Sequence, residues 1–150
     1  MEHIEDKKSG FRVRSIMLTE SHFNRIANVD FEEAHKDIRF ETGVGANGNI
    51  INVRLKTLVI CKKEDVEQYR IEVSMVGVFE RFGDSQIASN EEFGRVNGAA
   101  IIFPFVREHI SNIAMKAGIG SLILPPVNFS GKFSIEVQKS EGVLGLIIYT

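Results

Sequence analysis

Two stretches of strict alternation dominate the middle of the chain. From residue 51 to 59, apolar residues such as Ile51 and Val53 alternate with polar ones, and a second alternating stretch covers residues 69 to 79. A short charged segment, residues 62 to 67, joins them. Alternation with a period of two predicts β-strands that have one buried and one solvated face. Two such strands joined by a short turn predict an antiparallel pair.

The N-terminal part of the chain predicts two further strands. The first runs from Phe11 to Leu18 and the second, shorter one contains Ile38 and Phe40. The polar segment from 28 to 36 is expected to connect them. In the first strand, simple alternation places these residues on one face: Phe11, Val13, Ser15 and Met17. It places Arg12, Arg14, Ile16 and Leu18 on the other.

After residue 79 the pattern changes from strand to helix. Asn90, followed by Glu91 and Glu92, is typical of a helix N-cap with acids in the first turn. A second helix is predicted to begin near Phe103, because Pro104 is tolerated best in a first turn. Its sheet-facing stripe, at helical spacing, comprises Val106, Ile110, Ile113 and Ala117. Gly118 and Gly120 are expected to end it, and an apolar loop from Ser121 to Phe129 follows.

Strands first and helices later predict an α+β fold, a single domain over residues 1–150 with helices packed on one face of an antiparallel sheet. The charged residues 1–9 are expected to be flexible. Hydrophobic residues make up 43% and charged residues 25% of the chain, which is ordinary for a globular protein.

Charge and cysteine content exclude several classes of protein. The net charge of −2 predicts neither nucleic acid nor an anionic membrane as a partner. Cys61 is the only cysteine, so no internal disulfide forms. The charged N-terminus does not resemble a secretory signal, and no apolar run is long enough to insert into a membrane. These features predict a cytoplasmic protein.

No motif in the sequence assembles a catalytic or metal centre. Residues 43–48, GVGANG, match a dinucleotide-binding glycine pattern, but a strand rather than a helix follows them, so we expect a flexible loop over residues 43–49. The histidines, at positions 3, 22, 35 and 109, lack the spacing of metal ligands. Cys61 ends an alternating strand and is expected to pack as a small apolar side chain. We therefore predict no enzyme activity, no cofactor and no metal.

The second predicted helix carries more apolar surface than one sheet needs. Ile101, Phe105 and Met115 lie roughly opposite the sheet-facing stripe, with Asn112 between them. Two apolar stripes indicate two partners, so we expect self-association through this face. The alternative is that residues 118 to 129 fold over the second stripe.

Two motifs resemble a known family. Phe103-Pro104-Phe105-x-Arg107-Glu108 is followed, after a helix, by Leu122-x-Leu124-x-Pro126-Val127-Asn128-Phe129. This pair of motifs, with its spacing, is similar to that of the SecB export chaperones, and the likeness extends from about Phe11 to Phe133.

The resemblance implies a four-stranded antiparallel sheet with helices on one face, assembled as a dimer of dimers. It also implies an ATP-independent holdase chaperone that binds unfolded or precursor polypeptides in apolar grooves and keeps them competent for export or assembly. The groove residues it implies are Ile38, Phe40, Phe103, Phe105, Leu122, Leu124, Val127 and Phe129. The homotetramer interface would use Ile101, Phe105, Asn112 and Met115.

The chain also departs from the family pattern. Glu20 and Glu72 match acidic positions that dock the SecA motor, but Asn24 stands where an acid is expected and Arg70 where an apolar residue is expected. The family's last helix should follow Phe129, whereas residues 134–150 are divergent and end in the apolar GVLGLIIYT, a sequence suited to a strand or a self-binding segment.

Three hypotheses remain open at this point. The first is a SecB-type holdase, with a specialised chaperone for a single partner, such as an antitoxin, as its variant. The second is a small-molecule-binding or enzymatic α+β domain with a pocket of converging polar groups. The third is a structural adaptor for one native partner.

Overall fold

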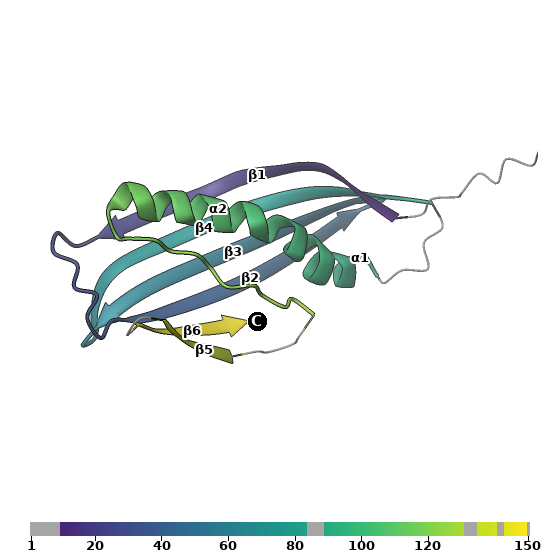
Figure 1. Ribbon diagram of the computed structural model, residues 1–150. Helices are drawn as coiled ribbons and strands as arrows, with labels where there is room; N and C mark the ends of the chain where they lie inside the picture. The colour runs from purple at the N-terminus through teal and green to yellow at the C-terminus, as the bar shows by residue number, and fades with distance from the viewer. Residues whose placement is uncertain (1–9, 84–88, 131–134, 141–142, 150) are drawn as a thin grey trace, which may run out of the picture.

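The computed structural model of the chain describes residues 10–83, 89–130, 135–140 and 143–149, with side chains as far as residue 130. The expected flexibility of residues 1–9 concerns a segment outside this range. One twisted sheet forms the back of the molecule and a helix lies across it (Figure 1). In spatial order the strands are β1 (Gly10–Arg25), β4 (Val66–Phe82), β3 (Ile50–Lys63), β2 (His35–Asn47), β6 (Val143–Tyr149) and β5 (Ile135–Ser140).

The first four strands form the predicted antiparallel sheet, with helices on one face. The β3–β4 pair follows the expected alternation, because Ile51, Val53 and Leu55 are fully buried while the residues between them are exposed or half-buried. The predicted loop at 43–49 is wrong. Gly43 and Gly45 continue β2, and only residues 48 and 49 form the turn. Pairing with β3 outweighs the weak strand propensity of glycine at these positions.

The predicted faces of β1 are also wrong beyond Val13. The register against β4 shifts between Val13 and Ser15 and again between Leu18 and Glu20. Each irregularity inserts an extra residue and reverses the alternation. Ile16 and Leu18 therefore share the helix-side face with Val13, whereas Ser15 and Met17 lie on the other face.

The helical region is one continuous stretch rather than two separate helices. It consists of α1 (Asn90–Glu92), the π-helical segment η1 (Phe93–Gly98) and α2 (Ala99–Ala117). The N-cap is Ser89 rather than Asn90: the Ser89 Oγ accepts a hydrogen bond from the backbone N–H of Glu92 at 3.2 Å.

Helix α2 begins four residues before the predicted start, so Pro104 lies inside it. Proline removes the hydrogen bond to the carbonyl of Ala100, at a cost of about 3 kcal/mol. Both residues are on the solvent side of the helix, where water can bond that carbonyl. On the opposite side, Ile102 and Val106 are fully buried, and this packing continues across the proline. Tertiary burial therefore outweighs the local penalty.

The C-terminal end of α2 is fixed to the sheet edge. Gly118 adopts the left-handed conformation that ends helices. The Arg25 guanidinium, at the end of β1, donates a hydrogen bond to the carbonyl of Ala117. A cation at this position also favours the negative end of the helix dipole. The following segment, Ile119–Ser130, crosses back over the sheet and is called the strap below (Figure 1).

The C-terminal residues extend the sheet. β6 pairs in parallel with β2, from His35 opposite Leu144 to Phe40 opposite Tyr149, and β5 pairs antiparallel with β6. The last helix that the family resemblance implies is therefore replaced, over the described residues, by two strands. The sheet contains the expected four antiparallel strands plus this pair.

Candidate binding site between α2, β2 and the strap

Three phenylalanine rings meet where helix, sheet and strap come together. Phe40 from β2, Phe103 from α2 and Phe129 from the strap pack edge to face, with ring centroids 5.7 to 5.9 Å apart. Each edge-to-face pair contributes about 0.5–1.5 kcal/mol beyond simple burial. The triad joins three segments that are distant in the sequence.

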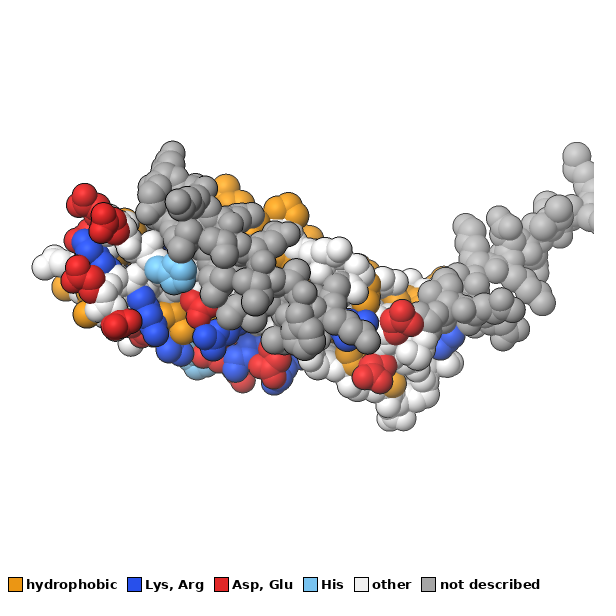
Figure 2. Space-filling model, turned by 90° about the horizontal axis from the view of Figure 1, so that it is seen from below, with side chains coloured by type: hydrophobic (Ala, Val, Ile, Leu, Met, Phe, Trp, Pro, Cys, Tyr) orange, Lys and Arg blue, Asp and Glu red, His pale blue; other side chains and the backbone are white. Residues whose placement is uncertain are grey.

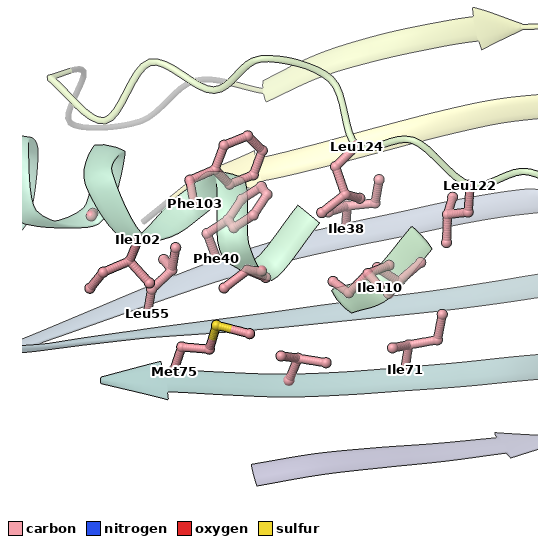
Figure 3. Close-up of a cluster of buried hydrophobic side chains, with 14 of the residues drawn as sticks. Ile38, Phe40, Leu55, Ile71, Met75, Ile102, Phe103, Ile110, Leu122 and Leu124 are labelled. Carbon is pink, nitrogen blue, oxygen red and sulfur yellow. The ribbon is translucent and has the colours of Figure 1, made fainter. Parts of the chain in front are cut away.

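The strap contributes most of its apolar side chains to the same cluster. Leu122, Leu124 and Phe129 are buried, whereas Ile123, between the two leucines, is 72% exposed. Figure 3 shows Leu124 next to Ile38 of β2 and Leu122 further along, with Phe103 next to Phe40. An extended chain that alternates in this way resembles a strand lying on an apolar surface.

The backbone of the strap contributes little to holding it in place. Within the described part of the chain, no backbone–backbone hydrogen bond involves residues 121 to 128. At the start of the strap, Gly120 adopts a positive φ that suits a sharp bend. The strap is therefore attached mainly by its buried side chains.

Six of the eight residues expected in a groove are brought together here, but all six are buried: Ile38, Phe40, Phe103, Leu122, Leu124 and Phe129. Val127 is half-buried against the same cluster. Phe105 lies elsewhere, 51% exposed on the opposite side of α2. The strap fills the space between α2 and β2 in this conformation.

The second apolar stripe of α2 is exposed as expected. Ile101, Phe105 and Met115 are all exposed, Met115 to 69%, and the strap does not cover them. Asn112, between them, is half-buried and its Nδ2 donates to the carboxylate of Glu108.

Sequence reasoning missed a second part of this exposed surface. On the helix-side face of β1, Val13, Leu18 and Phe23 are exposed. The strand lies beside α2, where Ser21 Oγ and His109 Nε2 are 2.9 Å apart. Simple alternation does not predict this apolar row, because the two bulges in β1 change which residues share a face.

The opposite face of the sheet carries the two acids that were expected to dock a motor. Glu20 is exposed on β1, and Glu72 on β4 bonds Lys56 Nζ at 2.8 Å. The hydrogen bond from Lys56 lowers the pKa of the Glu72 carboxyl, and the same contact raises the pKa of Lys56. Arg14 pairs with Glu80 and Arg54 with Glu41 on the same side of the sheet. Figure 2, which views the molecule from below, shows basic and acidic side chains interspersed rather than separated where they are visible. This face is therefore not predominantly acidic.

The structure places Asn24 and Arg70, the two departures from the family pattern, side by side. They form a cross-strand pair between β1 and β4. Arg70 bonds Glu67 at 2.9 Å and so further offsets negative charge at this end of the sheet.

Cys61 and Tyr69 are titratable groups that lie in the hydrophobic core. Burial raises the pKa of the Cys61 thiol and also that of Tyr69, its cross-strand neighbour. Cys61 thus packs in the core as expected. The described part of the chain has no group of three or more His, Cys, Asp or Glu side chains that could hold a metal ion. Among the described helices, none is long and apolar enough to span a membrane.

Comparison with known proteins identifies the family. The family model described as preprotein translocase subunit SecB matches residues 12–140. The chain belongs to the SecB family. It is 29% identical over 92 residues to the protein-export protein SecB of Hydrogenovibrio crunogenus, which covers 61% of each chain. It is 30% identical over 112 residues to that of Dechloromonas aromatica, covering 74% of this chain and 73% of the relative.

A solved structure supports the fold of this SecB-family chain. The SecB-like chaperone of Mycobacterium tuberculosis, in complex with a ChAD peptide from an antitoxin, matches 79% of this chain and 91% of its own length. The TM-score is 0.69 and the sequence identity 14%, so the likeness concerns the fold.

Proposed function

We propose that this SecB-family protein is an ATP-independent holdase chaperone. It binds extended apolar segments of unfolded or precursor proteins between α2 and β2 and keeps them competent for export or assembly. The observation that carries the proposal is the apolar cluster under the strap. There, Leu122, Leu124 and Phe129 fill the space beside Phe40 and Phe103, and within the described part of the chain residues 121–128 make no backbone–backbone hydrogen bonds. Its chemistry suits an extended apolar peptide.

In this proposal the strap acts as a cover. Ile38, Phe40 and Phe103 form the permanent side of the site, and Leu122, Leu124, Val127 and Phe129 leave it when the strap lifts. The strap is held by the burial of Leu122, Leu124 and Phe129, each worth about 1.5–3 kcal/mol, and this gain is opposed by a cost of about 1–2 kcal/mol for ordering each backbone unit. The two terms are of the same order and largely cancel, so an unfolded chain that makes similar contacts can replace the strap at a small net cost.

Self-association follows from the exposed apolar surface of α2 and β1. Met115, Phe105 and Ile101 on the helix and the neighbouring row on β1 together form an apolar surface of the kind that marks protein–protein interfaces. We propose that it joins copies of the chain, with Asn112 at its centre, into the dimer of dimers implied by the family. Several weak sites on one oligomer then act together on a long client.

Docking to the SecA motor would use the sheet face with Glu20 and Glu72. The interspersed charges, with Lys56 against Glu72 and Arg70 nearby, favour weak docking. A chaperone dedicated to one partner, such as an antitoxin of the kind whose peptide the SecB-like chaperone of Mycobacterium tuberculosis binds, is therefore the second candidate. The observation that favours it is this balance of charge on the docking face.

The holdase proposal is tested by measuring whether the protein suppresses the aggregation of denatured proteins in the absence of nucleotide. Two unrelated denatured proteins are diluted into buffer with increasing amounts of the chain, and light scattering is followed. A general holdase suppresses the aggregation of both at near-stoichiometric ratios. Suppression of neither, together with tight binding to one native protein, would instead support an adaptor.

A further inference from the structure

The edge of β2 adjoins the proposed site. Ile38 and Phe40 point from β2 into the apolar cluster, and the backbone of the same stretch, His35 to Phe40, forms the ladder with β6. Figure 3 shows both side chains on the strand that carries this edge. The edge thus offers backbone hydrogen bonds directly beside an apolar surface.

The strand β6, which pairs with this edge, is apolar, as the segments exposed by an unfolded client protein are. The strand β6, Val143–Tyr149, reads VLGLIIY and carries no charge. It pairs with β2 over six positions, in the parallel arrangement, which is slightly weaker per residue than the antiparallel one. An exposed strand edge binds extended chains of any sequence through the backbone, while neighbouring apolar positions select side chains.

We propose that the β2 edge from His35 to Phe40 is the backbone-binding part of the client site, and that β6 occupies it as a built-in competitor. An extended apolar segment of an unfolded protein adds to β2 as a strand when β6 leaves. This inference rests on the proposed holdase function and specifies how that site holds a client: by main-chain pairing as well as by apolar contact.

The competition has a measurable consequence. If β6 holds the edge for nine-tenths of the time, the apparent affinity for a client is about tenfold weaker than the intrinsic affinity. Locking β6 in place should abolish the pairing with clients, and releasing it should strengthen binding. Both changes can be made in the full-length chain.

The locking test uses a disulfide across the ladder. Arg39 and Ile148 are register partners, and neighbouring strands lie about 4.8 Å apart, within the range of a disulfide. The double variant R39C/I148C is oxidised, the crosslink is verified by mass spectrometry, and binding to reduced, carboxymethylated α-lactalbumin is measured before and after reduction. Cys61 is fully buried and does not compete. The single variants R39C and I148C are the controls.

We expect the oxidised double variant to bind the unfolded protein at least about tenfold more weakly than the reduced double variant does, so reduction should restore binding. Equal binding in both states, or failure of the crosslink to form, would overturn the edge proposal while leaving the holdase function in place. If neither the wild type nor the reduced variant binds the unfolded protein, the holdase function itself fails, and the edge proposal with it.

A second test weakens the pairing of β6 with β2 and measures separately how backbone pairing and apolar contact contribute to peptide binding. The variant Ile147→Pro removes a ladder bond from β6, which lies between β2 and β5 and so pairs on both sides. We expect it to bind a peptide of sequence GVLGLIIYT, with lysines appended for solubility, severalfold more tightly than the wild type does. The same peptide with alternate amides N-methylated keeps its side chains and should lose binding. Equal binding of the two peptides contradicts pairing at the edge.

Discussion

Replacing Phe129 with alanine tests whether the strap is a removable cover. A buried Phe→Ala substitution removes about 3–5 kcal/mol of packing, including part of the aromatic triad. Because Phe129 belongs to the strap, this loss falls on the docked strap and not on the sheet. A loss of about 3 kcal/mol shifts the ratio of open to docked strap about a hundredfold toward the open form, so a strap with a small net docking energy becomes mostly open.

The global effect should be smaller than the local one. A strap that is already undocked has no contacts left to lose, so weakening it further does not affect the sheet and helix. The substitution can therefore lower the free energy of global unfolding by no more than the net docking energy of the strap. The near cancellation of burial and ordering terms makes that docking energy small. We therefore expect a modest shift in the urea midpoint, well below 3–5 kcal/mol.

Hydrogen exchange with peptide-level resolution measures the two effects together. In Phe129→Ala, amides of residues 121–128 should exchange at close to the rate of an unstructured chain, while those of β3 and β4 stay protected. Binding of an unfolded client should tighten, since the competent state is more populated. The matched control is Ile123→Ala, in the same strap but exposed, which should change none of these. The reasoning is refuted if strap and sheet amides accelerate together and the full packing loss appears in global unfolding.

Three further predictions concern other parts of the molecule. Met115→Glu should lower the solution mass measured by light scattering without changing the circular dichroism, because it places a charge in the self-association surface, whereas Lys116→Glu next to it should not. Gly98→Ala should lower the unfolding free energy by about 1–3 kcal/mol, since its Cβ would lie 2.8 Å from a valine methyl of β3, whereas Gly45→Ala meets nothing within 4 Å. Asp30 has a pKa lowered by a hydrogen bond from a lysine of β3 and then by a backbone N–H, so its stabilising effect is present at neutral pH and is lost as the pH falls through its folded pKa. Asp30→Asn should accordingly lower the urea midpoint at pH 7, and the difference from wild type should shrink as the pH falls through the folded pKa of Asp30.

The sequence predicted those elements whose local pattern agrees with their tertiary role. β3 and β4 alternate cleanly because one face packs against α2, so Ile51 and Phe79 were assigned correctly. The exposed stripe with Met115 was predictable for the same reason, since helical spacing separates the two faces. The continuation of β2 through Gly43 was not, because its pairing with β3 overrides a turn-like composition.

Other features depend on tertiary packing and strand register, which the local sequence pattern does not indicate. The bulges in β1 reverse the alternation and bring Leu18 onto the apolar helix side. Pro104 lies inside α2 because packing on the buried side extends past it. The family resemblance names six residues that lie together in the structure and also Phe105, which lies on the other side of α2, and their role in a groove stays a prediction. Nothing in the sequence around Leu122 and Leu124 shows that the strap buries these side chains against β2 and α2.

Hydrogen exchange of the wild-type chain, alone and with a permanently unfolded protein, tests the central claim most directly. We predict that the client leaves the β2 amides from 35 to 40 protected, because it replaces β6 on that edge, and that the strap amides from 121 to 128 exchange faster than in the free chain as the strap is displaced. The central claim is contradicted if the client binds but the strap amides exchange as in the free chain, with new protection appearing on the charged face of the sheet instead.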